Sequence, residues 1–251
     1  MSTAGPSAEH RAPPARQASV ARTRGRVIYR RCIHETALLI RSWLLWPLVV
    51  LKPSRSFVYR GASYRYCYHP YGAAWMHERT VEIPIIWRCV EHALAAGKRV
   101  LEVGNTLSYY YHCRHDILDK YDVWGKPEVI NQDVVDFQPA HRYDLIVSIS
   151  TLEHVGWDED RDPTKFLRAV ANLKRCLAPG GALVVTIPLG YNPEVDALAK
   201  AGHLPFDDVA YLERVSSSNR WRETTRLTWK RYPLPFPSIR TIAIGMDSAA
   251  H

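Results

Sequence analysis

Three short and predominantly apolar runs constrain the fold of this chain more than any other feature of its sequence. They are RVLEV at 99–103, YDLIVSIS at 143–150 and ALVVTIP at 182–188. Each run is too short for a buried helix and is bounded by turn residues, so each predicts a strand that is buried on both faces. Helical patterns lie between them, from Thr80 to Ala96 and again after Pro163. Strands that alternate with helices predict a doubly wound, mostly parallel α/β sheet.

Weaker signals extend this pattern in both directions. The segments 115–121, 128–131 and 238–245 are further strand candidates. The helix after Pro163 should end at the Pro-Gly-Gly of 179–181, because proline and glycine commonly stop a helix. We therefore expect helices on both faces of the sheet.

Net charge divides the chain into two parts, and composition divides the first of them again. The whole chain carries +8, but residues 1–60 hold 11 Lys and Arg against 2 Asp and Glu, a net of +9. Residues 61–251 hold the other 22 Lys and Arg against 23 Asp and Glu, a net of −1. Composition predicts a disordered basic tail at 1–25, a basic and apolar helical extension at 26–60 and a folded domain at 61–251.

The extension permits two interpretations. Five arginines between residues 22 and 31 precede the apolar run 37–51, which contains Trp43 and Trp46 and is shorter than the roughly 20 apolar residues that span a bilayer. Segment 22–51 could lie on an anionic membrane surface. It could equally pack its apolar face on the domain. We expect a cytoplasmic protein, with peripheral membrane contact if the first interpretation holds.

The cysteines point to a reducing compartment. There are five of them, an odd number, and no two form a Cys-x-x-Cys pair. This spacing disfavours both a disulfide framework and a structural zinc site, and it fits the cytosol.

The loop after the first strand restricts the ligand. Doubly wound sheets bind ligands beyond the carboxyl ends of their strands, near the point where the strand order reverses. A dinucleotide site requires Gly-x-Gly-x-x-Gly, whereas the loop at 104–108 reads GNTLS. NAD and FAD are therefore disfavoured, and a ligand without a pyrophosphate fits better.

An ordered set of segments resembles the class I S-adenosylmethionine-dependent methyltransferases. They are VLEVGN at 100–105, ILDKYD at 117–122, NQDVVDF at 131–137, YDLIVSISTLEHVGW at 143–157 and LKRCLAPGGALVVTIP at 173–188. The likeness covers roughly residues 80–190. ERTVEIP at 78–84, with the later LEHVGWDE and PLGYNP, is also similar to a little-described bacterial branch, some of whose relatives are linked to sugars or glycans. The resemblance implies a Rossmann-like sheet of seven strands, S-adenosyl-L-methionine as cofactor and methyltransferase activity.

The resemblance also implies a cofactor site. Glu102 would face the methionyl ammonium, directly or through water, Asp119 would accept from the ribose hydroxyls and Asp133 from the adenine amino group. From the residues alone, Glu102 could instead cap the next helix, and Asp133 could hold a turn. A side chain at position 104 would meet the ligand, which explains the glycine there. The predicted cofactor-binding residues are Glu102, Gly104, Asn105, Asp119, Asp133 and Ser150.

The base candidates follow the fourth strand. Methyl transfer to a hydroxyl needs a group that takes the proton, and an imidazole near neutral pKa can do so. We predict His154 first and Glu153 second as catalytic residues, with Tyr191 and His203 behind them. We predict no metal site, because the acidic segment 157–162 is more typical of a solvated turn.

The acceptor is less constrained than the cofactor. Region 189–237 is rich in aromatic and polar side chains, which suit a small polar or glycan-like acceptor methylated at oxygen. One alternative is a non-catalytic scaffold that keeps the fold without cofactor turnover, since GNTLS lacks the usual glycines. Nucleic acid is disfavoured as a partner, because the domain has no basic stripe and no aromatic residue follows Asn192-Pro193.

Overall fold

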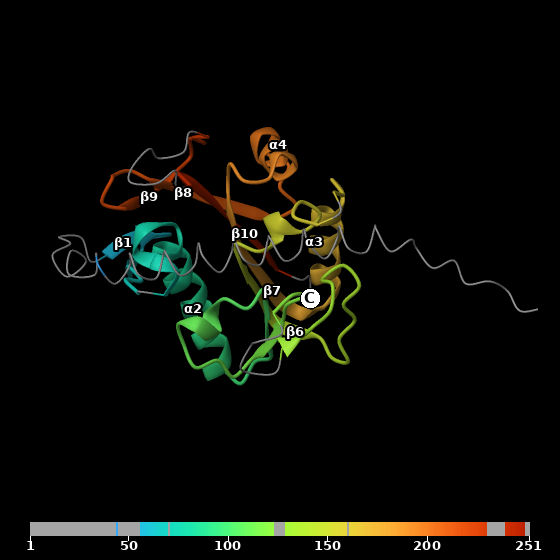
Figure 1. Cartoon of the computed structure of the whole chain (residues 1–251). Helices are drawn as coiled ribbons and strands as arrows, with labels where there is room; N and C mark the ends of the chain where they lie inside the picture. Colours follow the sequence, from blue (N-terminus) through green and yellow to red (C-terminus); the bar gives the residue numbers. More distant parts are fainter. Residues whose placement is uncertain are drawn as a thin grey trace, which may run out of the picture.

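The computed structural model of the chain describes residues 56–69, 71–122, 129–159, 161–229 and 239–248, together with Leu44 (Figure 1). The predictions for the tail at 1–25, for most of the extension at 26–60 and for membrane contact through 22–51 lie outside these residues. Within the described part, no helix is long and apolar enough to cross a bilayer.

A mixed sheet of eight strands forms the centre of the domain. Strands β5, β4, β3, β6 and β7 are parallel to one another. Strand β10 runs antiparallel to both β7 and β8, and β9 is antiparallel to β8. In spatial order the strands are β5 (Val129–Ile130), β4 (Asp116–Leu118), β3 (Val100–Val103), β6 (Tyr143–Ile149), β7 (Leu177–Pro188), β10 (Thr241–Ser248), β8 (Asp208–Arg214) and β9 (Trp221–Thr224).

The predicted fold class is confirmed, with one strand more than expected. The doubly wound, mostly parallel sheet is present, but it has eight described strands rather than seven. The sequence patterns located six of the eight strands and missed β8 and β9. Both are partly exposed, and neither DVAYLER of β8 nor WRET of the edge strand β9 carries a long apolar run.

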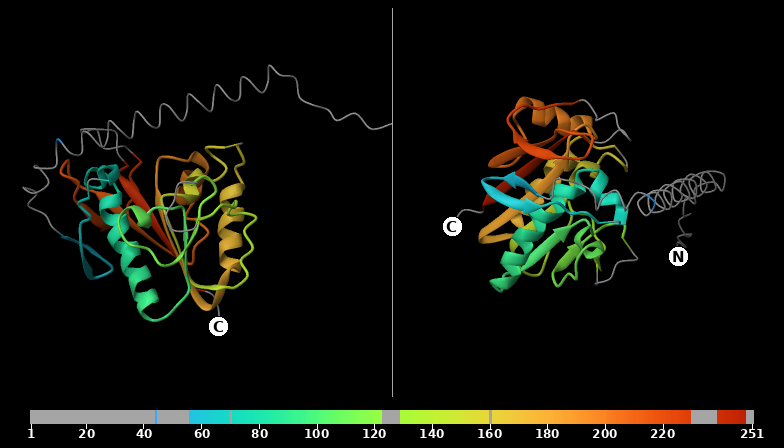
Figure 2. Two further views of the ribbon diagram at one scale, coloured as in Figure 1. Left: turned by 60° about the horizontal axis from the view of Figure 1, so that its bottom comes forward. Right: turned by 90° about the vertical axis from the view of Figure 1, so that its left-hand side faces the viewer.

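Helices cover both faces of the sheet, as Figure 2 shows. On one face α2 (Arg79–Ala95) packs with the β1–β2 hairpin (Ser56–Tyr59 and Ala62–Arg65) in one core cluster. On the other face α3 (Lys165–Arg175) and α4 (Pro193–Ala201) enclose the second cluster. Single 3-10 turns at Tyr71–Met76, Leu107–Tyr109 and Leu152–His154 complete the described elements.

The hairpin crosses the predicted boundary between residues 60 and 61. Phe57 and Tyr59 on β1 are 5% and 2% exposed and belong to the core of the domain. The Arg60 backbone amide donates to Glu223 on β9 at 3.0 Å. The folded domain therefore begins at or before Ser56, earlier than composition indicated, because the aromatic residues of β1 are part of its core.

Helix α2 contains a proline, and a segment outside the helix bonds to the backbone carbonyl that the proline leaves without an intrahelical partner. Pro84 has no amide hydrogen, so it cannot donate to the carbonyl of Thr80 one turn earlier. That carbonyl instead accepts from the backbone amide of Cys67, at 2.9 Å, just beyond β2. The proline thus lets the hairpin segment bond directly to the first turn of the helix.

Strand β7 begins earlier than its apolar run. It starts at Leu177 and carries the Pro-Gly-Gly segment within it, whereas the sequence placed the end of the preceding helix there; that helix, α3, ends at Arg175. The pairing with β6 shifts between Tyr143 and Leu145. A side chain at Gly181 would approach the carbonyl of Tyr143 to 2.9 Å, so glycine permits the two strands to meet at this irregularity.

Candidate functional site

The strand order reverses between β3 and β6. From β3 the chain proceeds outward to β4 and β5, and then returns to β6 on the other side of β3. The loops at the carboxyl ends of β3 and β6 therefore run in opposite directions from this point, where open α/β sheets bind ligands. We name the end of β3 and the described segments that follow β3, β4 and β5, residues 102–111, 119–122 and 131–137, the first wall. We name the start of α2 and the segment after β6, residues 150–154, the second wall.

Gly104 lies where the two walls meet. Its φ is +84°, and a Cβ added there would lie 2.1 Å from Oγ1 of Thr151. Its amide donates to the carbonyl of Leu118 at 2.8 Å. Any other residue would therefore be strained in its backbone and would collide with the opposite wall.

Glu102 holds the loop after β3 from beneath. It is completely buried, and its Oε1 accepts from the amides of Thr106 at 2.8 Å and Leu107 at 2.7 Å. Its Oε2 lies 2.9 Å from Nε2 of His115. The structure thus gives Glu102 the capping geometry that its sequence also permitted. A role toward a cofactor remains a prediction, and it would act through the loop.

Asp119 organises the same loop from the end of β4. One of its oxygens accepts from the amide of Asn105 at 3.0 Å, and the other accepts from the amides of Tyr121 and Asp122, each at 2.9 Å. The Asn105 side chain donates to Asp122 at 2.7 Å. A carboxylate has about four acceptor positions, so Asp119 retains capacity for one more donor.

The carboxylate of Asp133 is paired with two lysines of the protein. Its Oδ2 lies 2.8 Å from Nζ of Lys120 and 2.8 Å from Nζ of Lys165, and both lysines also contact Glu159. Burial alone would raise the pKa of Asp133, but the hydrogen bonds from Lys120 and Lys165 lower it to about 2. The sequence analysis missed this four-residue ion cluster, which joins strand ends to α3.

Ser150 turns the chain at the end of β6. It is 8% exposed with φ 43°, and its hydroxyl donates to Oε1 of Glu82 on α2 at 2.7 Å. Arg79, on the same helix, donates to the carbonyl of Ile149 at 3.1 Å and to Thr106 at 3.3 Å. The start of α2 is therefore bonded to both strand ends at the reversal point. Its residues Arg79 and Glu82 lie within the resembling segment 78–84 but had no assigned role.

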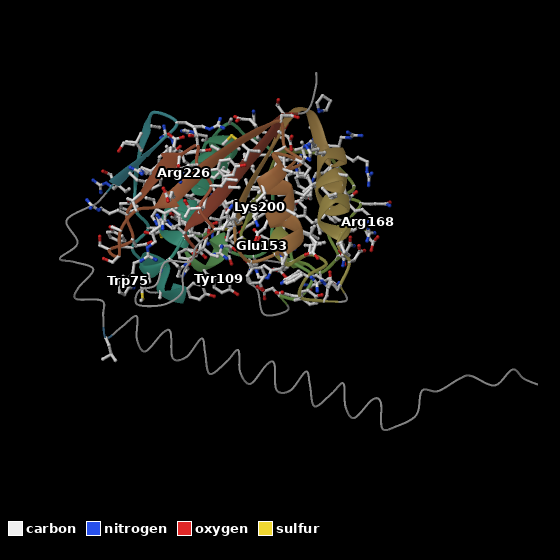
Figure 3. The ribbon with its side chains drawn as sticks, turned by 90° about the horizontal axis from the view of Figure 1, so that it is seen from above. Trp75, Tyr109, Glu153, Arg168, Lys200 and Arg226 are labelled. Carbon is white, nitrogen blue, oxygen red and sulfur yellow. The ribbon has the colours of Figure 1, made fainter. Side chains whose placement is uncertain are left out.

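Glu153 is buried on the second wall, and its neighbour fixes its backbone. It is 2% exposed, and its carbonyl accepts from the side chain of Asn192 at 2.8 Å. The oxygen of the same Asn192 caps α4, accepting from Glu194 at 3.0 Å. Figure 3 shows Glu153 in the interior, with Tyr109 closer to the edge of the domain in that view. Burial raises the pKa of Glu153 well above its ordinary value.

His154 is more accessible and is oriented by an acid. Its side chain is 42% exposed, and Nδ1 lies 2.6 Å from Oδ2 of Asp158. The hydroxyl of Tyr191 donates to the same carboxylate at 2.8 Å, and its ring lies 4.5 Å from the imidazole. The structure thus brings together His154, Tyr191 and an unforeseen Asp158. His203 is exposed beyond α4, and no described side-chain bond joins it to this group.

An aromatic pair stands at the rim of the first wall. Tyr71 and Tyr109 stack with ring centres 4.4 Å apart and 7° between planes, and they are 38% and 41% exposed. The Tyr109 hydroxyl donates to Asp122 at 3.2 Å. Neither residue was predicted, because isolated tyrosines in loops carry no periodic signal.

Among the described residues, one group has ligand atoms close enough to hold a metal ion. It consists of Glu102, Cys113 and His115, all buried. Burial raises the pKa of the Cys113 thiol to about 12, which keeps it protonated. Since Glu102 is already bonded to two amides and His115, we assign this group a structural role.

Comparisons with known proteins find structures only. No family model and no curated protein matches the chain. NodS from Bradyrhizobium japonicum, an N-methyltransferase solved with S-adenosyl-L-homocysteine, is 16% identical over 66% of this chain and 85% of that one, with a TM-score of 0.40. The sugar N-methyltransferase KedS8 from a Streptoalloteichus species is 12% identical over 69% of this chain and 89% of that one, with a TM-score of 0.38. An O-methyltransferase from Thermotoga maritima is 12% identical over 67% of this chain and 66% of that one, with a TM-score of 0.35. All three are methyltransferases.

Proposed function

We propose that this protein is an S-adenosylmethionine-dependent methyltransferase that acts on a hydroxyl of a small or glycan-like acceptor. One observation carries the proposal. The resembling segments that surround GNTLS come together at the strand-order reversal, where Gly104 meets Thr151 without room for a side chain; we call this place the crevice. This is where the fold class binds its ligands.

The residues of the first wall fit the cofactor that the resemblance implies. Asp119 has unused acceptor capacity for a ribose hydroxyl, and Asn105 is 9% exposed beside it. Asp133 stays ionised, because its pKa is held at about 2, and can accept from an amino group. Glu102 would support the site by fixing the loop. When bound, the cofactor supplies a methyl group on a sulfonium.

His154 is proposed as the base. If Nδ1 carries the proton that Asp158 accepts, Nε2 is left as an acceptor on an imidazole whose side chain is 42% exposed. A hydroxyl positioned in line with the methyl group would then lose its proton to Nε2 while its oxygen attacks. Glu153 is proposed second. Burial raises its pKa and favours its protonated form, which can donate a hydrogen bond.

The alternative is a scaffold that keeps the fold without turnover. One observation favours it, namely that Glu102 and Asp119 are already bonded within the protein. A scaffold of this kind would have no need to bind the cofactor.

Calorimetry separates the two functions. We expect the full chain to bind both S-adenosylmethionine and S-adenosylhomocysteine, and Asp119→Ala to weaken both. Methyl transfer is then assayed on a panel of methyl glycosides with tritiated cofactor. Absence of binding of either ligand at millimolar concentration would rule out the enzyme and leave the scaffold.

A further inference from the structure

Two buried carboxyl groups on the second wall each keep an oxygen without a partner. Glu82 is 0% exposed and Glu153 is 2% exposed. Oε1 of Glu82 accepts from Ser150, whereas Oε2 of Glu82 and Oε2 of Glu153 have no hydrogen bond of normal geometry among the described residues. The hydroxyl of Thr186 on β7 lies near Glu82 and lowers its pKa. Native proteins rarely leave buried acceptors unpaired, and such atoms commonly mark a functional site.

The surroundings offer only partial compensation for charge on these groups. Nε of Arg79 is 3.9 Å from Oε2 of Glu82, which is too long for a hydrogen bond. Nε2 of His154 is 3.6 Å from Oε1 of Glu153. Further acidic groups add to the local negative potential. The titratable groups that face the pair from neighbouring elements are Glu78, Arg79, Tyr110 and His154.

The pair therefore holds a proton in the empty protein. Burial raises the pKa of Glu82 to about 7, although Arg79 opposes the shift. Burial also raises the pKa of Glu153, and the charge of Glu82 adds to that effect. Near neutral pH Glu82 is divided between its two forms and the equilibrium of Glu153 is shifted toward its protonated form, so a small change in potential moves a proton.

The pair lies directly behind the crevice. Ser150, which bonds to Glu82, precedes Thr151, the residue that faces Gly104. Arg79 connects the same helix turn to Thr106 in the opposite loop. A positive charge placed between the walls would be close to both carboxyl groups with little water between them, and would favour their ionised forms.

We propose that Glu82 and Glu153 form a charge-sensing acid pair, which releases a proton when the sulfonium donor occupies the crevice and regains it when the neutral thioether product remains. The proposal rests on the proposed function, since it takes S-adenosylmethionine as the donor. The donor and S-adenosylhomocysteine share their nucleoside and amino-acid groups but differ by one methyl group and one positive charge. The pair therefore distinguishes donor from product by charge, and the ratio of their affinities rises with pH across neutrality.

Calorimetry in two buffers tests the proposal on the full chain. Proton release is obtained at pH 7 from the difference between binding enthalpies in phosphate and in Tris. We expect S-adenosylmethionine to release a larger fraction of a proton than S-adenosylhomocysteine does. Glu82→Gln should remove this difference, whereas Glu91→Gln, an exposed position on the same helix, should preserve it.

The outcomes separate this proposal from the proposed function. If both ligands bind with equal proton release, or if Glu82→Gln leaves the difference intact, the charge-sensing pair is wrong and the methyltransferase stands. If neither ligand binds, both proposals fail.

A second measurement keeps the proposal testable even if Glu82→Gln does not fold. Carbon-13 NMR of glutamate carboxyl groups in the unaltered protein should show one signal that titrates near neutral pH. At pH 7 that signal should move to the ionised position on adding S-adenosylmethionine and not on adding S-adenosylhomocysteine. Movement with both ligands, or with neither, would overturn the assignment.

Discussion

The two walls of the crevice use their carboxyl groups in opposite ways. On the first wall Glu102, Asp119 and Asp133 are each bonded to amides, a histidine or lysines of the protein itself. On the second wall Glu82 and Glu153 are more deeply buried than Asp119 or Asp133, yet each keeps an unpaired oxygen. Internal partners fix the shape of the first wall before any ligand arrives. The second wall retains buried acceptors that a ligand or a proton can satisfy.

This contrast separates preorganisation from reactivity. A carboxylate that accepts several hydrogen bonds stays ionised and rigid, and so it suits a site that must hold a ligand in one pose. A buried carboxyl without partners exchanges protons near neutral pH, which suits a place where charge changes during reaction. We expect the two walls to respond differently to substitution and to pH.

Gly104→Ala should have the largest effect, because it forces the two walls apart. A Cβ at this position combines backbone strain with a contact of 2.1 Å to Thr151, so we expect a loss of about 3 kcal/mol of stability and of measurable cofactor binding. Gly97→Ala is the matched control, since its φ is +69° and its Cβ would meet nothing within 4 Å. It should cost about 1 kcal/mol and leave binding intact. Equal effects in both variants, by urea unfolding and calorimetry, would refute the role of the contact.

Asp158→Asn should lower kcat by roughly 10²-fold or more, because His154 would lose the acceptor that fixes its tautomer. Cofactor affinity should remain unchanged, since the residue is not on the first wall. The effect is measured as turnover of tritiated cofactor with a methyl glycoside that the unaltered protein methylates. Asp162→Asn, in the same acidic segment, is the control and should leave kcat as it is. An unchanged kcat in Asp158→Asn would contradict the assignment of His154 as the base.

Glu82→Gln should remove a pH dependence of stability. Because the folded pKa of Glu82 is raised from 4.5 to about 7, the folded state binds the proton more tightly than the unfolded state does. This contribution is fully present below pH 4.5 and is lost as the pH rises to 7, by an amount on the order of 3 kcal/mol. Relative to the variant, the unaltered protein should therefore lose stability across this window. Parallel stability curves from urea unfolding would show that folding leaves the pKa of Glu82 unshifted.

Asp133→Asn should show the opposite sign and the smallest size. The pKa of Asp133 is lowered to about 2, so its stabilising contribution is present above pH 4 and is lost as the pH falls toward 2. Since solvent reaches the lysine cluster, we expect a loss of less than about 1 kcal/mol at pH 7. Unfolding at pH 7 and pH 3 measures it. A loss as large as that of Gly104→Ala would mean that the cluster is a structural centre of the first wall.

Sequence patterning predicted the buried parts of the fold well, because hydrophobic periodicity records burial. The runs at β3, β6 and β7 were found, whereas β9 was missed, since it is polar and lies at an edge. The beginning of β7 was missed for a different reason. Its Pro-Gly-Gly segment reads as a turn, yet the irregular pairing with β6 admits it.

The candidate site was only partly predictable from the residues. Motif order located Gly104, Asp119 and His154 near the crevice, because strand ends converge there. The partners of those residues come from distant segments, as with Glu82 beneath Ser150, 68 positions away. A single sequence carries no signal for such contacts. It likewise could not show that Glu102 is turned inward to hold its own loop.

The proline within α2 also determines how the hairpin is attached to the domain. The carbonyl of Thr80 is free for Cys67 because residue 84 cannot donate to it. An ordinary residue there would supply an amide that competes for the same oxygen, and β2 would lose that link to the helix. Because Glu82 lies between Thr80 and Pro84, any shift of this turn on ligand binding would be felt at the hairpin. The rate of hydrogen exchange at the Cys67 amide would then report, from outside the crevice, whether the crevice is occupied.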